Sequence, residues 1–301
     1  MQMQIKSQFN FFIILLVFIS HSAQSTYASS NIAGIPSQTA TMTIVANTAT
    51  TITGIVVVSL VVGNLVSFMF GAYPKSYDEI PLDNEEKEVV EEMKELIQSS
   101  VGSSGLEEIN VSLGEIYTQH NYFDEGKEYL ESALTENPNN PIGLAWLGVN
   151  EAKQASQMFD WYSMGAHKIH LVGVAIDKIN RSVEIAPKNI ILRIIRLSTF
   201  SSIGFSKLKD KVNTDLEFLL SASKEEENSP NLLKSFYSAI IRGQFYLYNK
   251  SETESKKQNV AKIALKYYEL YSSFVATSNL DVRDKQELSE MIKTLETDTK
   301  S

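Results

Sequence analysis

The chain has 301 residues, which is enough for about two ordinary domains or for one extended helical array with an added segment. Its 36 acidic residues outnumber its 27 basic ones and give a net charge of −9, which argues against a broad phosphate-binding surface and therefore against a nucleic-acid-binding protein. The absence of cysteine excludes disulfides, thiolate-ligated metals and thiol nucleophiles, and it is compatible with either redox compartment.

Residues 1–28 have the pattern of a secretory signal. Lys6 precedes an apolar run from Phe11 to Ile19, which is shorter than the roughly 20 residues that a membrane-spanning helix needs. Thr26-Tyr27-Ala28 places small residues at the two positions that a signal peptidase reads, and His21-Ser22-Ala23 is a poorer alternative. We expect a signal peptide here, with an uncleaved N-terminal anchor or a re-entrant segment as the alternative.

Residues 29–51 carry no charge, are rich in Ser, Thr and Ala, and are expected to form a linker. The stretch from Ile52 to Phe70 is also uncharged, and apolar side chains occupy every face of a helix built from it. This favours a transmembrane helix over residues 52–72 rather than the buried helix of a soluble domain. Small residues at Ser59, Gly63 and Ser67 have a spacing that allows two helices to approach, which is a weak indication of self-association.

Few charges are present to set the topology. Lys6 and Lys75 flank the two apolar runs and no Lys or Arg lies between those runs, so a hairpin with both ends in the cytoplasm satisfies the positive-inside rule. A cleaved signal followed by a stop-transfer helix also leaves the C-terminal part in the cytoplasm. We therefore predict a membrane protein whose large domain is cytoplasmic, with an extracytoplasmic domain as the alternative if residues 52–70 fail to stop transfer.

Residues 73–82 include two prolines and are predicted to be a second linker. Asp83 or Asn84 can then cap a helix with an acidic first turn. An apolar stripe at helical spacing follows, made of Val89, Val90, Met93, Leu96 and Ile97. Residues 83–299 are predicted to be one α-helical domain.

The segment from Leu113 to Pro138 carries the clearest pattern in the chain. Leu113, Gly114 and Tyr117 share one helical face, and small or apolar residues follow Tyr117 at intervals of 9, 13, 16 and 21, namely Gly126, Leu130, Ala133 and Pro138. This predicts two helices, at about 106–120 and 123–136, that pack through glycines and end at a proline. The segment closely resembles a tetratricopeptide repeat.

A second copy of the pattern begins 34 residues later, at Leu147-Gly148. Its closing proline is expected at position 172 but stands at Pro187, where Ala175 has the same offset from it that Gly126 has from Pro138. The second unit therefore has about fifteen additional residues, either as longer helices or as a turn near residues 160–165. The resemblance is clear over about residues 106–187 and weaker to 275. Further helices are expected at 189–203, 207–223, 231–248, 254–275 and 280–295.

The resemblance implies an all-α fold in which antiparallel helix pairs stack into a superhelix, whose concave side holds a peptide or extended segment of a protein partner. Carried over by position, that side includes Asn110, Glu115, Asn150, Lys153, Arg193 and Arg196. The paired Lys and Asn of the family's carboxylate clamp are not reproduced as a set, so a C-terminal peptide ligand is not predicted.

Three groups of side chains have alternative interpretations. Arg193 and Arg196 lie in an apolar helix, and we favour pairing with Asp215 over an anion or carboxylate anchor. His167 and His170 are one turn apart, but no third ligand has a suitable spacing, so no metal site is predicted. Two aromatic groups are expected to be core rather than a ligand pocket; they are Trp146, Phe159, Trp161 and Tyr162, and Phe245, Tyr246, Tyr248, Tyr267, Tyr268 and Tyr271.

No glycine-rich phosphate loop, serine elbow or acid–base pair is present, so neither catalysis nor a cofactor is expected. The predicted function is that of a membrane-tethered scaffold or assembly factor that binds another protein. The alternative is an exported helical-repeat protein that binds a ligand for a solute transporter. The oligomeric state is left open.

Overall fold

The computed structural model describes residues 77–99, 106–158, 166–222, 230–274, 276 and 278–300. The predicted signal segment, the linker over 29–51 and the predicted transmembrane helix over 52–72 lie outside these residues. Within them, no helix combines the length and the apolar character needed to cross a bilayer.

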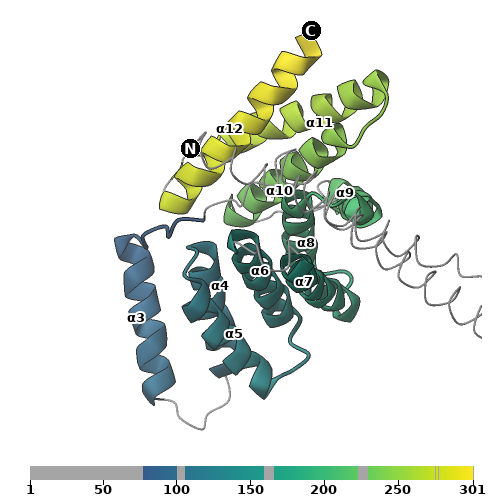
Figure 1. Cartoon of the computed structure of the whole chain (residues 1–301). Helices are drawn as coiled ribbons and strands as arrows, with labels where there is room; N and C mark the ends of the chain where they lie inside the picture. Colours follow the sequence, from purple (N-terminus) through teal and green to yellow (C-terminus); the bar gives the residue numbers. More distant parts are fainter. Residues whose placement is uncertain are drawn as a thin grey trace, which may run out of the picture. The chain divides into compact units, whose positions relative to one another are not determined.

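Every regular element of the described residues is helical, as predicted (Figure 1). The α-helices are α3 (Asn84–Ser99), α4 (Leu106–Gln119), α5 (Phe123–Glu136), α6 (Pro141–Gln157), α7 (Ala166–Ile185), α8 (Ile190–Ile203), α9 (Lys209–Ala222), α10 (Pro230–Asn249), α11 (Glu254–Ser272) and α12 (Asn279–Lys300), and a short 3-10 helix η1 (Ser206–Leu208) precedes α9.

The helices pack in consecutive pairs, which confirms the predicted pairing. α4 packs on α5, α6 on α7, α8 on α9 and α10 on α11, and the first helices of the pairs also contact one another in the order α4, α6, α8, α10. Helices α10 and α11 both contact α12. Helix packing of this repeat-like kind joins each pair mainly to its neighbours.

Local sequence signals explain where several helices begin and end. Asp83 accepts a hydrogen bond from the Glu86 backbone N–H at 2.9 Å, and the Glu86 carboxylate accepts one from the Asp83 N–H at 2.8 Å, which is a capping box at the start of α3. Asn140 caps α6, where Pro141 takes the first helical position. Gly204 ends α8 with a φ of 74°, a conformation that glycine adopts without strain.

The first helix pair is built as its spacing predicts. Leu113, Leu130 and Ala133 are fully buried, and the Leu130 side chain lies against the bare backbone of Gly114. The backbone of Gly126 lies equally close to α4 and α6. Glycine at these two positions lets the helices approach more closely than any side chain allows.

The second pair has longer helices, which is one of the two alternatives that the sequence left open for its additional residues; the other, a turn near residues 160–165, lies outside the described residues. Helix α6 has 17 residues and α7 has 20, against 14 in each helix of the first pair. Gly148 of α6 faces Ala175 and Ile179 of α7, so the two copies of the pattern use glycine in the same way. Helix α7 ends two residues before Pro187.

The apolar stripe predicted for α3 is only partly buried. Val90 is buried, and Met93 and Ile97 pack beside it against α4, but Val89 and Leu96 are 41% and 50% exposed. The apolar stripe of α3 therefore extends beyond the face that packs against α4, and its edge remains in solvent.

The C-terminal aromatic residues belong to the core, as predicted. Tyr246, Tyr248, Tyr267 and Tyr271 are buried in the main apolar cluster of the domain, which is formed by α6 to α12. Trp146 packs against the same cluster. The other three aromatic residues that the sequence grouped with it, at positions 159, 161 and 162, lie outside the described residues.

Candidate functional site

A short non-helical segment precedes α3 and lies across the carboxyl ends of α4 and α6. We call this segment, Tyr77–Leu82, the strap. In Figure 1 it is the blue trace that leads into α3. Ile80 precedes a proline, which disfavours a helical conformation at that residue.

The array binds the strap mainly through its backbone. Gln157 at the end of α6 donates to the Tyr77 carbonyl at 2.8 Å, and Asn121 after α4 donates to the Asp78 carbonyl at 2.8 Å. Asn279, the first residue of α12, donates to the Pro81 carbonyl at 3.0 Å. Side-chain amides that donate to backbone carbonyl oxygens recognise the backbone conformation of a peptide rather than its sequence.

His120 and Ile80 form the centre of this contact. The Ile80 N–H donates to the His120 carbonyl at 2.9 Å, and His120 Nδ1 donates to the Ile80 carbonyl at 2.8 Å. On its other side, His120 Nε2 lies 3.1 Å from the Glu86 carboxylate of α3. Ile80 is only 9% exposed, and burying a side chain of this size contributes about 1.5–3 kcal/mol.

Tyr77 occupies the first of two side-chain subsites, and Ile80 occupies the second. The Tyr77 ring packs nearly perpendicular to the Phe123 ring, with 6.2 Å between ring centres, and Lys153 Nζ lies 5.7 Å from the centre of the Tyr77 ring. Burial raises the pKa of the Tyr77 hydroxyl above its usual range, and a hydrogen bond with Ser156 opposes that shift. Tyr77 and Ile80 therefore anchor the strap three residues apart.

Lys153 is a partly buried cation in this site. Its Nζ donates to the Thr118 carbonyl at 3.0 Å and to Asn121 Oδ1 at 3.1 Å. Desolvation lowers the pKa of Lys153 to about 8, helped by the nearby charges of Arg283 and Arg242 and opposed by the Glu287 carboxylate.

Of the three cations near the strap, only Arg242 is paired directly with carboxylates in the part of the chain that the structure describes. Arg242 pairs with both Asp284 and Glu287 of α12. Among the residues that the structure describes, neither Lys153 nor Arg283 forms an ion pair with a carboxylate, although Arg283 Nη1 donates to the Asp78 carbonyl at 3.4 Å. The strap site therefore has two cations without a direct carboxylate contact among the described residues, and the Glu287 carboxylate attracts Lys153 at longer range.

We expect the stability to respond to pH through Lys153. Because its folded pKa of about 8 is below its ordinary value of 10.5, the unfolded chain binds more protons between these two pH values, and the free energy of unfolding rises with pH there. Relative to a Lys153→Met variant, the wild type should gain about 2–3 kcal/mol between pH 8 and pH 10. Denaturant unfolding at both pH values measures the difference, in which tyrosine titration cancels. A constant difference contradicts the prediction.

The other residues predicted for a concave binding face have different surroundings. Asn150 is fully buried and donates to Thr118 Oγ1 and to the Phe123 carbonyl, both at 3.0 Å, so it fixes the turn between α4 and α5. Its Oδ1 is buried without a hydrogen-bond partner among the described residues. Asn110 is also buried and lies 3.4 Å from Ser132 Oγ. As placed, Asn110 and Asn150 hold helices together.

Glu115 of α4 is a partly buried carboxyl beside α6. Desolvation raises its pKa to about 7, although Gln119 Nε2 donates to it at 2.9 Å. The Trp146 indole nitrogen lies near this carboxyl and is buried without a hydrogen bond of normal geometry among the described residues. Glu115 therefore changes charge close to neutral pH.

Replacing Glu115 with Gln should stabilise the protein above neutral pH. Because the folded pKa is raised from 4.5 to about 7, the contribution of Glu115 to the stability of the wild type is greatest below pH 4.5 and is lost as the pH rises through 7. At pH 8 the variant should unfold with a free energy about 1–3 kcal/mol higher than the wild type. Glu108→Gln, an exposed change on the same helix, is the control. Equal pH dependence in the wild type and in Glu115→Gln contradicts the prediction.

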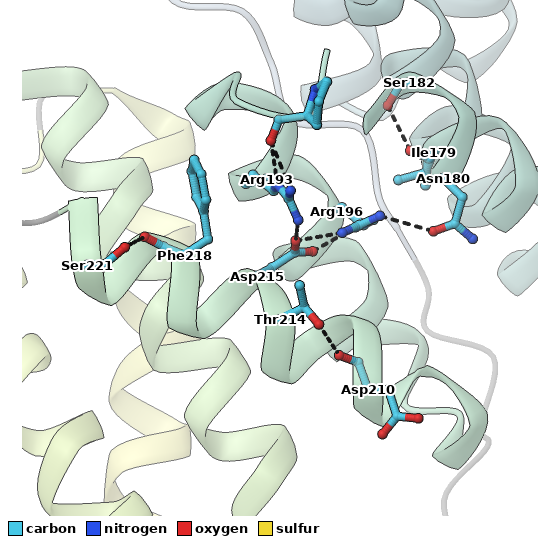
Figure 2. Close-up of polar contacts among 11 residues, drawn as sticks. Ile179, Asn180, Ser182, Arg193, Arg196, Asp210, Thr214, Asp215, Phe218 and Ser221 are labelled. Carbon is cyan, nitrogen blue, oxygen red and sulfur yellow. Dashed lines mark hydrogen bonds and ion pairs between the residues drawn. The ribbon is translucent and has the colours of Figure 1, made fainter. Parts of the chain in front are cut away.

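Arg193 and Arg196 form an internal ion pair network, the alternative that the sequence favours (Figure 2). Arg196 binds both oxygens of Asp215 at 2.7 Å, and Arg193 Nη1 binds Asp215 Oδ1 at 2.7 Å. Arg193 also donates to the Pro187 carbonyl and lies over the Phe218 ring. Asp215 is fully buried. Because both arginines lie on α8 and Asp215 lies on α9, the network joins these two helices.

Sequence reasoning placed Lys153 in a binding site but missed the other groups around it. Asn121, Gln157 and Arg283 are separated by up to 162 residues in the chain, and Tyr77 lies in a segment predicted to be a linker. The one local signal of a bound segment was the pair of apolar side chains before Pro81, namely Tyr77 and Ile80. Among the described residues, no group of three potential ligands could hold a metal ion, and His167 and His170 are exposed.

The comparisons leave the family open. No family model matches this chain, and no curated protein shows significant sequence similarity to it.

Proposed function

We propose that this protein is a membrane-tethered, non-catalytic scaffold or assembly factor, whose helical pairs are tetratricopeptide-like and bind an extended segment of another protein. The observation that carries the proposal is the strap, because the array already binds a non-helical segment of its own chain through backbone carbonyls and two side-chain subsites. Helical repeat arrays present continuous surfaces suited to such ligands.

The proposed tether is the apolar stretch at 52–72. Only four residues lie between position 72 and Tyr77, so five Cα–Cα steps join them, and a chain extends by at most about 3.6 Å per step. On this proposal the strap site lies within roughly 18 Å of the end of the membrane helix. A partner bound there is held close to the bilayer, which suits an assembly factor for membrane proteins.

The proposal is tested by site-specific photocrosslinking in cells, with the full chain extracted in detergent. A photoreactive residue replaces Gln154, which lies on α6 one turn before Gln157, and a matched one replaces the exposed Leu270 of α11. We expect a discrete protein adduct from position 154 and none from position 270. Extraction as a soluble monomer without an adduct at position 154 contradicts the proposal.

A reporter fused after Ser301 separates this function from that of an exported accessory protein for a transporter. The proposal expects the reporter in the cytoplasm. An extracytoplasmic reporter favours the transporter alternative.

A further inference from the structure

The strap site has the features of a recognition site for a definable peptide sequence, and this inference rests on the proposed function. We propose that the site accepts, in place of the strap, an extended acidic segment of a partner protein with an aromatic residue and, three residues later, a branched aliphatic residue followed by proline. The strap sequence Tyr77-Asp78-Glu79-Ile80-Pro81 is an internal version of that ligand.

The backbone contacts explain why a foreign segment can replace the strap. The array contacts carbonyl oxygens of Tyr77, Asp78, Ile80 and Pro81 and the N–H of Ile80. Each of these backbone groups is present in any peptide. The proline adds one requirement of its own, because it holds the residue before it in an extended conformation. A partner segment of similar sequence thus meets the same donors and acceptors.

The side-chain subsites set the sequence preference. The first subsite holds an aromatic ring that packs nearly perpendicular to the Phe123 ring and lies under the amine of Lys153, which favours the π face of Tyr, Phe or Trp. The second subsite encloses Ile80, a branched aliphatic residue. Side chains between these anchors remain in solvent, because Asp78 and Glu79 are exposed.

The charges at the site favour an acidic partner. Lys153 and Arg283 border the strap and lack a carboxylate partner among the described residues, whereas the neighbouring Arg242 is paired with α12. An acidic residue near the aromatic anchor gains attraction from both cations. A basic segment meets like charges there and is disfavoured.

The strap and the partner compete for one site. A segment joined to its site by a short connection has an effective concentration in the millimolar range. The wild-type strap therefore masks the site from weak ligands, and only a partner that binds more tightly, or that is held at the same membrane, displaces it.

The test measures binding of a fluorescent peptide with the sequence of residues 75–84, KSYDEIPLDN, to the full chain in detergent micelles. The variant Tyr77→Ala/Ile80→Ala removes both anchors of the strap and leaves the site unchanged. We expect it to bind the peptide about 10–100-fold more tightly than the wild type, because the internal competitor is lost. A peptide with Ala at the two anchor positions should bind neither protein.

Two further variants locate the binding. Adding Gln157→Ala and Asn121→Gly to the strap variant should reduce the affinity at least 10-fold, and glycine suits the positive φ of 65° at Asn121. Adding Gln258→Ala on the remote helix α11 should leave the affinity unchanged. Circular dichroism and cooperative thermal unfolding confirm that each variant is folded.

Three outcomes overturn the inference. The strap variant can be folded and bind the peptide no better than the wild type, or its binding can be insensitive to the changes at Gln157 and Asn121. In the third, the wild type is a dimer and the strap variant a monomer by light scattering, which assigns the site to the strap of a second copy. If the crosslinked adduct at position 154 forms but excess peptide does not compete with it, this inference fails while the proposed scaffold function stands.

Discussion

Replacing Asp215 with Asn should destabilise the protein by about 3–5 kcal/mol. The carboxylate is fully buried and binds two guanidinium groups, and Arg196 is only 3% exposed. Without the negative charge, Arg196 remains buried with no compensating anion, which costs more than the ion pair itself contributes. The melting temperature should fall by roughly 6–20 °C in a thermal unfolding experiment on the full chain.

The matched control for this change is Asp210→Asn on the same helix. Asp210 is exposed at the start of α9 (Figure 2), so its loss should change the free energy of unfolding by less than about 0.5 kcal/mol. The double variant Arg196→Met/Asp215→Leu removes both buried charges and should recover part of the stability that Asp215→Asn loses. If Asp215→Asn and Asp210→Asn unfold alike, the network does not stabilise the junction of α8 and α9.

Replacing Gly148 with Ala should destabilise the second helix pair by about 1–3 kcal/mol. A Cβ atom at this position lies 2.6 Å from Ile179 Cγ1 and 2.8 Å from the Ala175 carbonyl oxygen, which is backbone and cannot rotate away. Helices α6 and α7 must therefore move apart. This loss outweighs the gain of up to about 1 kcal/mol that alanine brings to a helix interior.

Gly173 of α7 provides the opposite case. No atom lies within 4 Å of a Cβ built there, so Gly173→Ala should raise stability by up to about 1 kcal/mol through helix propensity alone. Both variants are compared by chemical denaturation. Stabilisation by Gly148→Ala contradicts the view that close helix packing, rather than backbone freedom, requires glycine at position 148.

Local patterns determined the helices of this protein and their pairing. The intervals between Tyr117 and Pro138 predicted α4 and α5 to within one residue, because apolar periodicity, close-packing glycines and a closing proline are all properties of neighbouring residues. The repeated Leu147-Gly148 pattern likewise predicted a second helix pair with additional residues, and left open whether longer helices or an added turn would hold them. The pairing of Arg193 and Arg196 with Asp215 followed from the high cost of burying an unpaired charge.

Only the tertiary structure decided which polar residues hold helices together and which surround a ligand-like segment. Asn150 and Lys153 are less than one turn apart on α6, yet the first is buried under the turn after α4 and the second borders the strap. The strap site itself combines the ends of α4 and α6 with the start of α12, from residues 121, 157 and 279. Such contacts depend on how helices distant in the chain meet, and no periodicity within one helix carries that information.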